Sequence, residues 1–306
     1  MCYSPESTPR EIPIDVLIEK LNPAGGQNRH QARLDFDIRG SCDGLVCVEV
    51  HDSYKVRVFL WNPCTRECVE VKEGNGEDSY SLPMLHGFGY DYNSDDYKVL
   101  SVLYQSKTAT YKSMIYTLRT NSWRRIQDYP LGASLTEKCA TFVSGALYWL
   151  VRRILNDVFT KVIISLNLTS EAYMEVPQPD YGTNTRYDQY RVGALEGCLC
   201  LLVFNITSRF QKELWVMKEY GVKESWTKYL TIPQPLGCGN LISLSRLIWF
   251  LGNDEIVLDL DREMVLYNTK TKSRTYLGIP VCSYYKSHVY VESLVSLNAY
   301  NELGSK

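Results

Sequence analysis

The residues that could carry catalysis are few and lie far apart in this sequence. The four histidines are isolated from one another and form neither the H-E-x-x-H pattern of zinc proteases nor part of a G-x-S-x-G nucleophile elbow. They stand at His30, His51, His86 and His288. A nucleophile and its base can be assembled from distant parts of a chain, but no residue pattern here argues for one. We therefore expect a protein that is not an enzyme, with no catalytic residues and no cofactor.

Two short patterns have the spacing of metal ligands, and each is incomplete. Cys64 and Cys68 could form half of a zinc site, but no second Cys/His pair stands at zinc-finger distance from them. Residues 91–95 (DYNSD) supply the first three oxygen ligands of a calcium loop. However, Asp96 stands where that loop requires Gly, and Val102 stands where it requires Glu. The sequence therefore predicts no metal site.

The residues best suited to recognition lie in long polar segments. Four of these stand out, at 72–86, 104–111, 127–137 and 177–190. The last reads PQPDYGTNTRYDQY, and its Tyr, Asn and Arg content is typical of interfaces. The same composition also fits a solvated connector. The candidate target-binding residues are Tyr181, Asn184, Arg186, Tyr187 and Tyr190.

The composition limits which binding partners and which cellular compartment we expect. The formal charge of −2 and the pI near 6.1 provide no long-range attraction for nucleic acid or an anionic membrane. No stretch of 18 uninterrupted apolar residues is present, so we expect no membrane span. The ten cysteines lie mostly in apolar runs and the N-terminus does not resemble a secretory signal. Reduced thiols, and with them the cytoplasm or the nucleus, are the simplest expectation.

The elements that must position these residues form a repeat from Gly40 onward. Apolar strand cores recur at steps of 52, 49, 52, 49 and 42 residues. They begin near Leu45, Tyr97, Ala146, Cys198, Leu247 and Val289. Tyrosine, with 23 residues, suits such strands because aromatic rings pack on a pleated face.

A second marker keeps the same period. Five units contain a strand, a short polar turn and another strand, at 59–71, 114–126, 163–176, 213–232 and 264–279. One equivalent slot is occupied in turn by Cys68, Trp123, Tyr173, Trp226 and Arg274. In the 213–232 unit, Gly221 can adopt the positive φ that a tight reversal needs. Glycines of Asp43-Gly44, Ser144-Gly145 and Glu196-Gly197 similarly predict two-residue hairpin turns.

A period of about fifty residues, built from short strands, predicts a β-propeller. We expect an all-β, kelch-like ring of six blades over residues 33–300, preceded by an N-terminal segment, 1–32. The sixth unit, at 281–297, lacks an outer hairpin. We therefore expect the strand at 33–38 to complete it, because a ring must leave no unpaired strand edge.

The N-terminal segment has its own pattern. Residues 12–21 (IPIDVLIEKL) place apolar side chains at helical spacing, with Pro at the first turn. This predicts one short helix, followed by a flexible polar connector, AGGQNRHQ.

The sequence motifs of the repeats resemble those of a known family. FLWNPCTR, HGFGYDYNSDDYKVL, GALYWL and ELWVMKEYGVKESWTKYLTI look like successive signatures of plant F-box proteins with a C-terminal F-box-associated domain. The resemblance covers about residues 40–297. The S-locus F-box proteins, which act in self-incompatibility, are one branch of this family with similar motifs.

That resemblance implies a function. Such proteins are substrate receptors of SCF-type ubiquitin ligases, in which the F-box docks on a Skp-type adaptor and a cullin scaffold while the associated domain captures a target. For the S-locus branch the target would be S-RNase-like. Residues that match the opening helix of an F-box, and so become adaptor-binding candidates, are Ile12, Pro13, Val16, Leu17 and Leu21. The expected continuation of the F-box is absent, so it resembles a truncated one. The alternative function is therefore a stand-alone protein-binding propeller that does not engage the ligase.

Overall fold

The computed structural model describes residues 2–4, 7–10, 35–51, 56–72, 81–129, 133–135, 139–155, 158–181, 187–205, 211–232, 246–252, 254–260, 263–280 and 290–303. Within these stretches the chain is almost entirely strand and turn, with one α-helix, α2 (Leu297–Leu303), and one short 3-10 helix, η1 (Lys223–Ser225). The predicted all-β class is confirmed.

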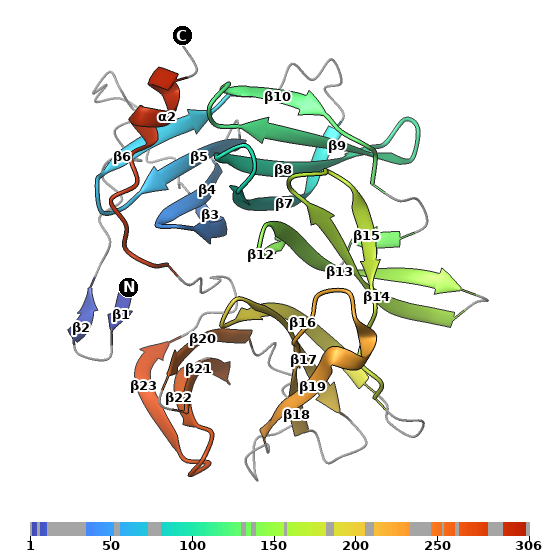
Figure 1. The fold of residues 1–306 in the computed structure, drawn as a ribbon, viewed down its shortest axis with the longest axis vertical. Helices are drawn as coiled ribbons and strands as arrows, with labels where there is room; N and C mark the ends of the chain where they lie inside the picture. The colour runs from blue at the N-terminus through green and yellow to red at the C-terminus, as the bar shows by residue number, and fades with distance from the viewer. Residues whose placement is uncertain are drawn as a thin grey trace.

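Five antiparallel sheets stand around a common axis as the blades of a propeller (Figure 1). In each blade the strands lie side by side in chain order, and the first strand lies nearest the axis. The blades consist of β3 (Asp35–Cys42), β4 (Leu45–His51), β5 (Val56–Asn62) and β6 (Glu67–Val71); β7 (Ser81–Asp91), β8 (Asp96–Gln105), β9 (Thr110–Thr117) and β10 (Ser122–Arg125); β12 (Thr141–Val143), β13 (Ala146–Leu155), β14 (Val158–Asn167) and β15 (Tyr173–Val176); β16 (Tyr187–Leu195), β17 (Cys198–Asn205), β18 (Gln211–Met217) and β19 (Trp226–Ile232); and β20 (Arg246–Gly252), β21 (Glu255–Leu260), β22 (Glu263–Asn268) and β23 (Arg274–Pro280).

Two further elements complete the sheets. In blade three, β11 (Ala133–Leu135) pairs with the far half of β13, so β11 and β12 share one edge of that strand. A separate hairpin of β1 (Cys2–Ser4) and β2 (Ser7–Arg10) precedes the ring.

The middle strands are buried on both faces, which explains their continuous apolar runs. On β13, Leu147 and Trp149 pack against blade two, whereas Tyr148 and Leu150 pack against blade four. A strand with neighbours on both sides has no solvent face and therefore shows no apolar–polar alternation. The core is thus a series of layers between successive blades.

The predicted hairpin turns are confirmed. Both residues of each pair have positive φ, with values of 48° and 82° at Asp43-Gly44, 45° and 81° at Ser144-Gly145, and 48° and 74° at Glu196-Gly197. This is the conformation of type I′ turns, whose twist matches that of the flanking strands.

The outer hairpins are confirmed as well. All five residues of the equivalent slot lie at the start of the fourth strand of a blade, each opposite the end of the third strand. Trp226 pairs with Met217 and is buried between blades three and four, and Gly221 in the turn has φ of 78°. The residues at which the predicted apolar strand cores begin lie on the second strand in blades one to four, but Leu247 lies on the first strand of blade five.

The prediction of six blades is wrong, because the described residues form five. The strand expected to complete a sixth blade is β3, and it instead pairs with β4 as the inner strand of blade one. The described part of the expected last strand, residues 290–296, contains no strand. Its carbonyls at Ser293 and Val295 accept hydrogen bonds from Asn62 Nδ2, at 3.1 and 2.7 Å, so side-chain contacts replace sheet pairing there.

The C-terminal segment, residues 290–303, is part of the core of blades one and two. Leu297 is fully buried there, and Val295 and Tyr300 pack beside it. Glu67 accepts hydrogen bonds from the backbone N–H of Leu297 at 2.5 Å and of Asn298 at 3.3 Å, so it caps the first turn of α2. The predicted helix at 12–21 and its polar connector lie outside the described residues, and the boundary at 32/33 stays a prediction.

Candidate protein-binding site

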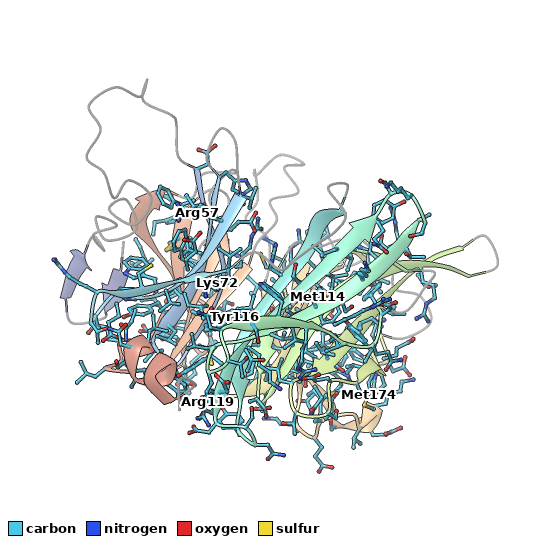
Figure 2. The ribbon with its side chains drawn as sticks, turned by 90° about the horizontal axis from the view of Figure 1, so that it is seen from above. Arg57, Lys72, Met114, Tyr116, Arg119 and Met174 are labelled. Carbon is cyan, nitrogen blue, oxygen red and sulfur yellow. The ribbon has the colours of Figure 1, made fainter. Side chains whose placement is uncertain are left out.

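The ring has two different faces. Because every strand pairing within a blade is antiparallel, the turns between first and second strands and between third and fourth strands lie on one face, the turn face. Connections between second and third strands and between blades lie on the other, the loop face. Figure 2 shows the ring edge-on, with Arg57 at the loop end of β5 near the top and Arg119, at the turn end of β9, near the bottom beside α2.

The described ends of all four long polar segments lie at the loop face. Three of them, 72–86, 127–137 and 177–190, connect successive blades, and 104–111 joins β8 to β9. The segments are shorter than expected, because 81–86 belongs to β7 and 187–190 belongs to β16. The ring therefore gathers on one face residues that are about fifty positions apart in sequence.

Two of the five predicted target-binding residues can be placed, and they lie together. The rings of Tyr181 and Tyr190 meet edge to face with centroids 5.9 Å apart. Asn184 and Arg186 lie outside the described residues, and Tyr187 is described only in its backbone, at the start of β16. The structure thus brings two of the predicted residues, Tyr181 and Tyr190, into contact.

A third aromatic residue completes this group. Trp215 on β18 lies edge to face with Tyr181, at a centroid distance of 6.0 Å. The Tyr181 hydroxyl donates to Gln178 Oε1 at 3.1 Å. All three rings are half-buried, so they combine packing between blades three and four with a surface open to a partner.

Lysines lie over two of these rings. Lys161 Nζ is 4.7 Å from the centroid of Tyr190, and Lys228 Nζ is 5.1 Å from that of Trp215. We call Tyr181, Tyr190, Trp215, Lys161 and Lys228 the seam patch, because they lie where blades three and four meet. The sequence analysis missed the last three. The alternation of β18 and its pairing with β19 place Trp215 beside Lys228, but that register is not evident before the sheet is known.

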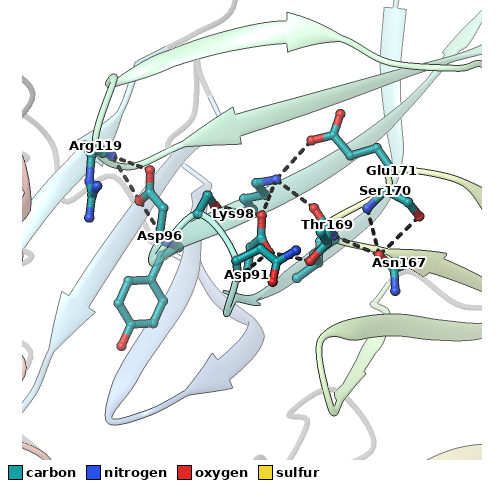
Figure 3. A network of polar contacts seen from close by, with 12 residues as sticks. Asp91, Asp96, Lys98, Arg119, Asn167, Thr169, Ser170 and Glu171 are labelled. Atoms are coloured by element: carbon teal, nitrogen blue, oxygen red, sulfur yellow. Dashed lines mark hydrogen bonds and ion pairs between the residues drawn. The ribbon is translucent and has the colours of Figure 1, made fainter.

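A polar network joins blades two and three on the turn side of the ring (Figure 3). The ammonium group of Lys98 donates to Leu168 O at 2.7 Å and lies 2.9 Å from Asp91 and 3.0 Å from Glu171. Thr169 also donates to Asp91, at 2.5 Å. Burial raises the pKa of Asp91, but the hydrogen bonds from Thr169 and Lys98 outweigh burial and hold the pKa well below its usual range. Asp91, the first residue of the calcium-like pattern at 91–95, therefore serves an inter-blade contact.

A second charged cluster lies near the axis. Glu49 accepts a hydrogen bond from Arg39 at 2.6 Å and lies 2.9 Å from His51 Nε2 and 3.3 Å from His86 Nε2. Two histidines that look isolated in the sequence therefore share one carboxylate. His86 is buried, its ring nitrogens have no hydrogen-bond partner among the described residues, and burial lowers its pKa to about 4.

This axial cluster is not a metal site. Across the described part of the chain, no group of three or more His, Cys, Asp or Glu residues is arranged to hold a metal ion. Nor is any helix of that part long and apolar enough to cross a membrane. The seven cysteines placed there, including Cys64 and Cys68, are not joined in disulfide bonds.

The comparisons with known proteins agree with this architecture. The family model of the F-box associated beta propeller domain matches residues 14–297. The chain belongs to this family. An F-box/kelch-repeat protein of Arabidopsis thaliana is 27% identical over 267 residues, covering 86% of this chain and 70% of the relative. An F-box protein of the same plant is 29% identical over 288 residues, covering 80% of this chain and 67% of the relative.

These comparisons confirm the resemblance to plant F-box proteins with an associated domain. Among solved structures, TolB from Acinetobacter baumannii aligns over 86% of this chain and 56% of its own, with a TM-score of 0.41 and 10% identity. That level of similarity is too low to inform function. Members of the F-box associated propeller family are generally non-catalytic adaptors.

Proposed function

We propose that this chain is the substrate receptor of an SCF-type ubiquitin ligase and captures a target protein on the loop face of its propeller. The observation that carries the proposal is membership of the F-box associated propeller family, with relatives named as F-box proteins. A Skp-type adaptor and a cullin scaffold are the partners that such a role requires. The ligase would operate in the cytoplasm or the nucleus.

The structure of the ring suits this role. Five blades packed face to face provide a rigid base, and loops that connect rigid elements are where binding residues are commonly found. The receptor would contribute proximity, because holding a target beside the conjugating enzyme raises the effective concentration of its lysines. No bond chemistry by the receptor itself is needed.

Adaptor binding is the part of the proposal that can be tested with purified components. We expect the chain to bind a Skp-type adaptor, and we expect Val16→Asp or Leu17→Asp to weaken binding because a charge would replace an apolar contact. Glu19→Gln, in the same segment, is the matched control and should bind as the wild type does. No binding of the wild-type chain at micromolar concentrations would reject the ligase role.

The alternative is a stand-alone protein-binding propeller. In that case the chain retains a target without any adaptor, and substitutions at Val16 and Leu17 have no effect on target capture. An S-RNase-like target is the finer prediction from the S-locus resemblance, and a general receptor is its alternative. Affinity capture from the native tissue distinguishes them by the protein recovered.

A further inference from the structure

The most exposed apolar side chains of the described chain lie on the turn face of the ring. Leu294 is 86% exposed, Tyr92 64% and Val291 56%, the highest values among the large apolar side chains that the structure describes. Tyr92 belongs to the inner turn of blade two, where an inner turn joins the first and second strands of a blade. Single exposed apolar residues are ordinary, whereas a group of them indicates a surface for a partner.

Tyr92 lies among the inner turns next to the axis. A Cβ on Gly145, in the inner turn of blade three, would be 3.6 Å from Tyr92 Cδ2. Ser144, in the same turn, donates a hydrogen bond of 2.9 Å to the carbonyl of Gly197 in blade four. Partial burial and the carboxylate of Asp43, in the inner turn of blade one, raise the pKa of Tyr92. The inner turns of blades one to four therefore form one continuous surface.

The C-terminal segment extends this surface along blade one. The Tyr290 hydroxyl donates to Cys64 Sγ at 3.3 Å, in the turn between the third and fourth strands. Ser293 lies against the inner turn, since a Cβ on Gly44 would be 2.1 Å from Ser293 Cβ. The segment thus passes over both turns of blade one, and its two exposed apolar side chains lie close to the surface that the inner turns form.

The charged groups of this surface are carboxylates. Three of them are exposed and have no ion-pair partner among the described residues, namely Asp43, Glu196 and Glu292. Asp95 of blade two is already paired with Arg119 at 3.2 Å. Asp254 of blade five is paired with Lys270 at 2.6 Å. The described residues of the inner turns include no Lys or Arg, so no cation of these turns compensates the three carboxylates.

This combination determines the chemistry of a partner. Carboxylates repel phosphate groups, so a nucleic acid or an anionic membrane surface does not fit. A protein segment with Lys or Arg beside apolar residues fits both features, because its cations meet the carboxylates while its apolar residues cover the exposed side chains. An ammonium or guanidinium group can also lie over the face of an exposed Tyr ring.

We propose that a basic and apolar segment of a partner protein docks on this surface. We call the surface the turn-face patch, and it consists of Tyr92, Val291 and Leu294 with the carboxylates of Asp43, Glu196 and Glu292. The patch lies on the face opposite the loops that we assign to target capture, so the inference goes beyond the proposed function. Neither adaptor binding through residues 12–21 nor target capture on the loop face depends on it.

The test uses the purified full chain and short fluorescein-labelled peptides in fluorescence anisotropy titrations. One peptide combines Lys with Leu and a single Tyr. Matched peptides replace its Lys residues with Glu, or its Leu and Tyr residues with Ser. We expect the basic peptide to bind at least about tenfold more tightly than the acidic one, and its affinity should fall as salt is raised. Loss of the apolar residues should weaken binding by at least about threefold.

Charge variants locate the binding. Glu196→Gln/Glu292→Gln should weaken the basic peptide by about threefold to tenfold, because two exposed ion pairs are lost. Glu219→Gln/Glu224→Gln makes the same change in net charge at exposed positions of the outer turn of blade four. It should change the affinity by less than about twofold at an ionic strength of about 0.15 M, where screening confines charge effects to about 8 Å.

An apolar variant tests the other half of the patch. Leu294→Ser replaces a side chain that is already exposed, so it should leave the free energy of unfolding within about 0.5 kcal/mol of wild type. The basic peptide should nevertheless bind at least about threefold more weakly. Val222→Ser, at an apolar position of the same face that is 39% exposed, is the matched control and should bind as the wild type does.

Three results would overturn the proposal. They are equal affinity for the basic and acidic peptides, equal weakening by the two charge-neutralised variants, and no binding of the basic peptide at micromolar concentrations. The titration uses no adaptor and no target, so its failure is distinguishable from failure of the ligase role. Val16→Asp, which tests that role, should bind the basic peptide as the wild type does.

Discussion

Lys98 of blade two donates a hydrogen bond of 2.7 Å to the backbone carbonyl of Leu168 in blade three, across 70 positions of sequence. The same ammonium group lies within 3.0 Å of Asp91 and Glu171 and is almost completely buried. One side chain thus connects the third-to-fourth strand turn of blade three to the preceding blade.

Replacing Lys98 tests that contact. Lys98→Met keeps the length of the side chain but leaves Asp91 without its buried cation, so the free energy of unfolding should fall by about 3–5 kcal/mol. Chemical denaturation measures the change. Lys107→Met removes an exposed lysine from the same blade and should stay within about 0.5 kcal/mol of wild type. Equal, small effects of both substitutions would show that the network adds little stability.

The close approach of the C-terminal segment to blade one gives a second prediction. A Cβ on Gly44 would lie 2.1 Å from Ser293 Cβ, whereas a Cβ on Gly197 would meet nothing within 4 Å. Both glycines have positive φ, at 82° and 74°. Gly197→Ala should therefore cost only the backbone strain, about 1–2 kcal/mol. Gly44→Ala should cost more and should also displace residues 290–303.

Limited proteolysis reports that displacement. In Gly44→Ala we expect faster cleavage within residues 290–303, while Gly197→Ala should be cleaved at the wild-type rate. Identical cleavage of the two variants, together with equal losses in the free energy of unfolding, would contradict the role assigned to the contact with Ser293.

The buried side chain of His86 should make the stability of the fold depend on pH. Its pKa is lowered to about 4 by burial in the folded chain, against about 6.5 in an unfolded one. As pH falls from about 6.5 toward 4, the unfolded state takes up a proton that the folded state does not. The free energy of unfolding should therefore decrease across this window, by up to about 1.4 kcal/mol per pH unit from this group.

His86→Leu removes the titrating group and retains an apolar side chain of related size. Its free energy of unfolding, measured by denaturation at a series of pH values, should vary less between pH 6.5 and 4 than that of wild type. Parallel curves for the two proteins would assign the acid sensitivity to other groups.

Sequence could predict the parts of the fold that repeat. The slot filled by Trp123, Tyr173 and Trp226 recurs at the blade period, because each of these side chains fills the same position against its neighbour. How the ring closes could not be predicted from the repeat. Residues 290–297 have the alternation of a strand, yet Asn62 and Glu67 bind their backbone, and nothing in the repeat marks those two side chains for that task.

The candidate site was predicted in part for a similar reason. Tyr181 and Tyr190 belong to one polar segment, so composition alone identified them. Lys161 and Trp215 come from strands on either side of the seam, and only the packing of blade three on blade four brings them to the same tyrosines. Composition identifies site residues that are close in sequence, whereas the register of two sheets decides which distant residues join them.

The receptor proposal is tested most directly by affinity capture of the tagged full chain from plant tissue, with the adaptor, the cullin and the target quantified by mass spectrometry. The ligase role predicts that a Skp-type adaptor and a cullin are recovered with the wild-type chain and are lost with Val16→Asp. It also predicts that target capture survives that substitution. Recovery of a target with neither adaptor nor cullin would contradict the ligase role and favour the stand-alone propeller.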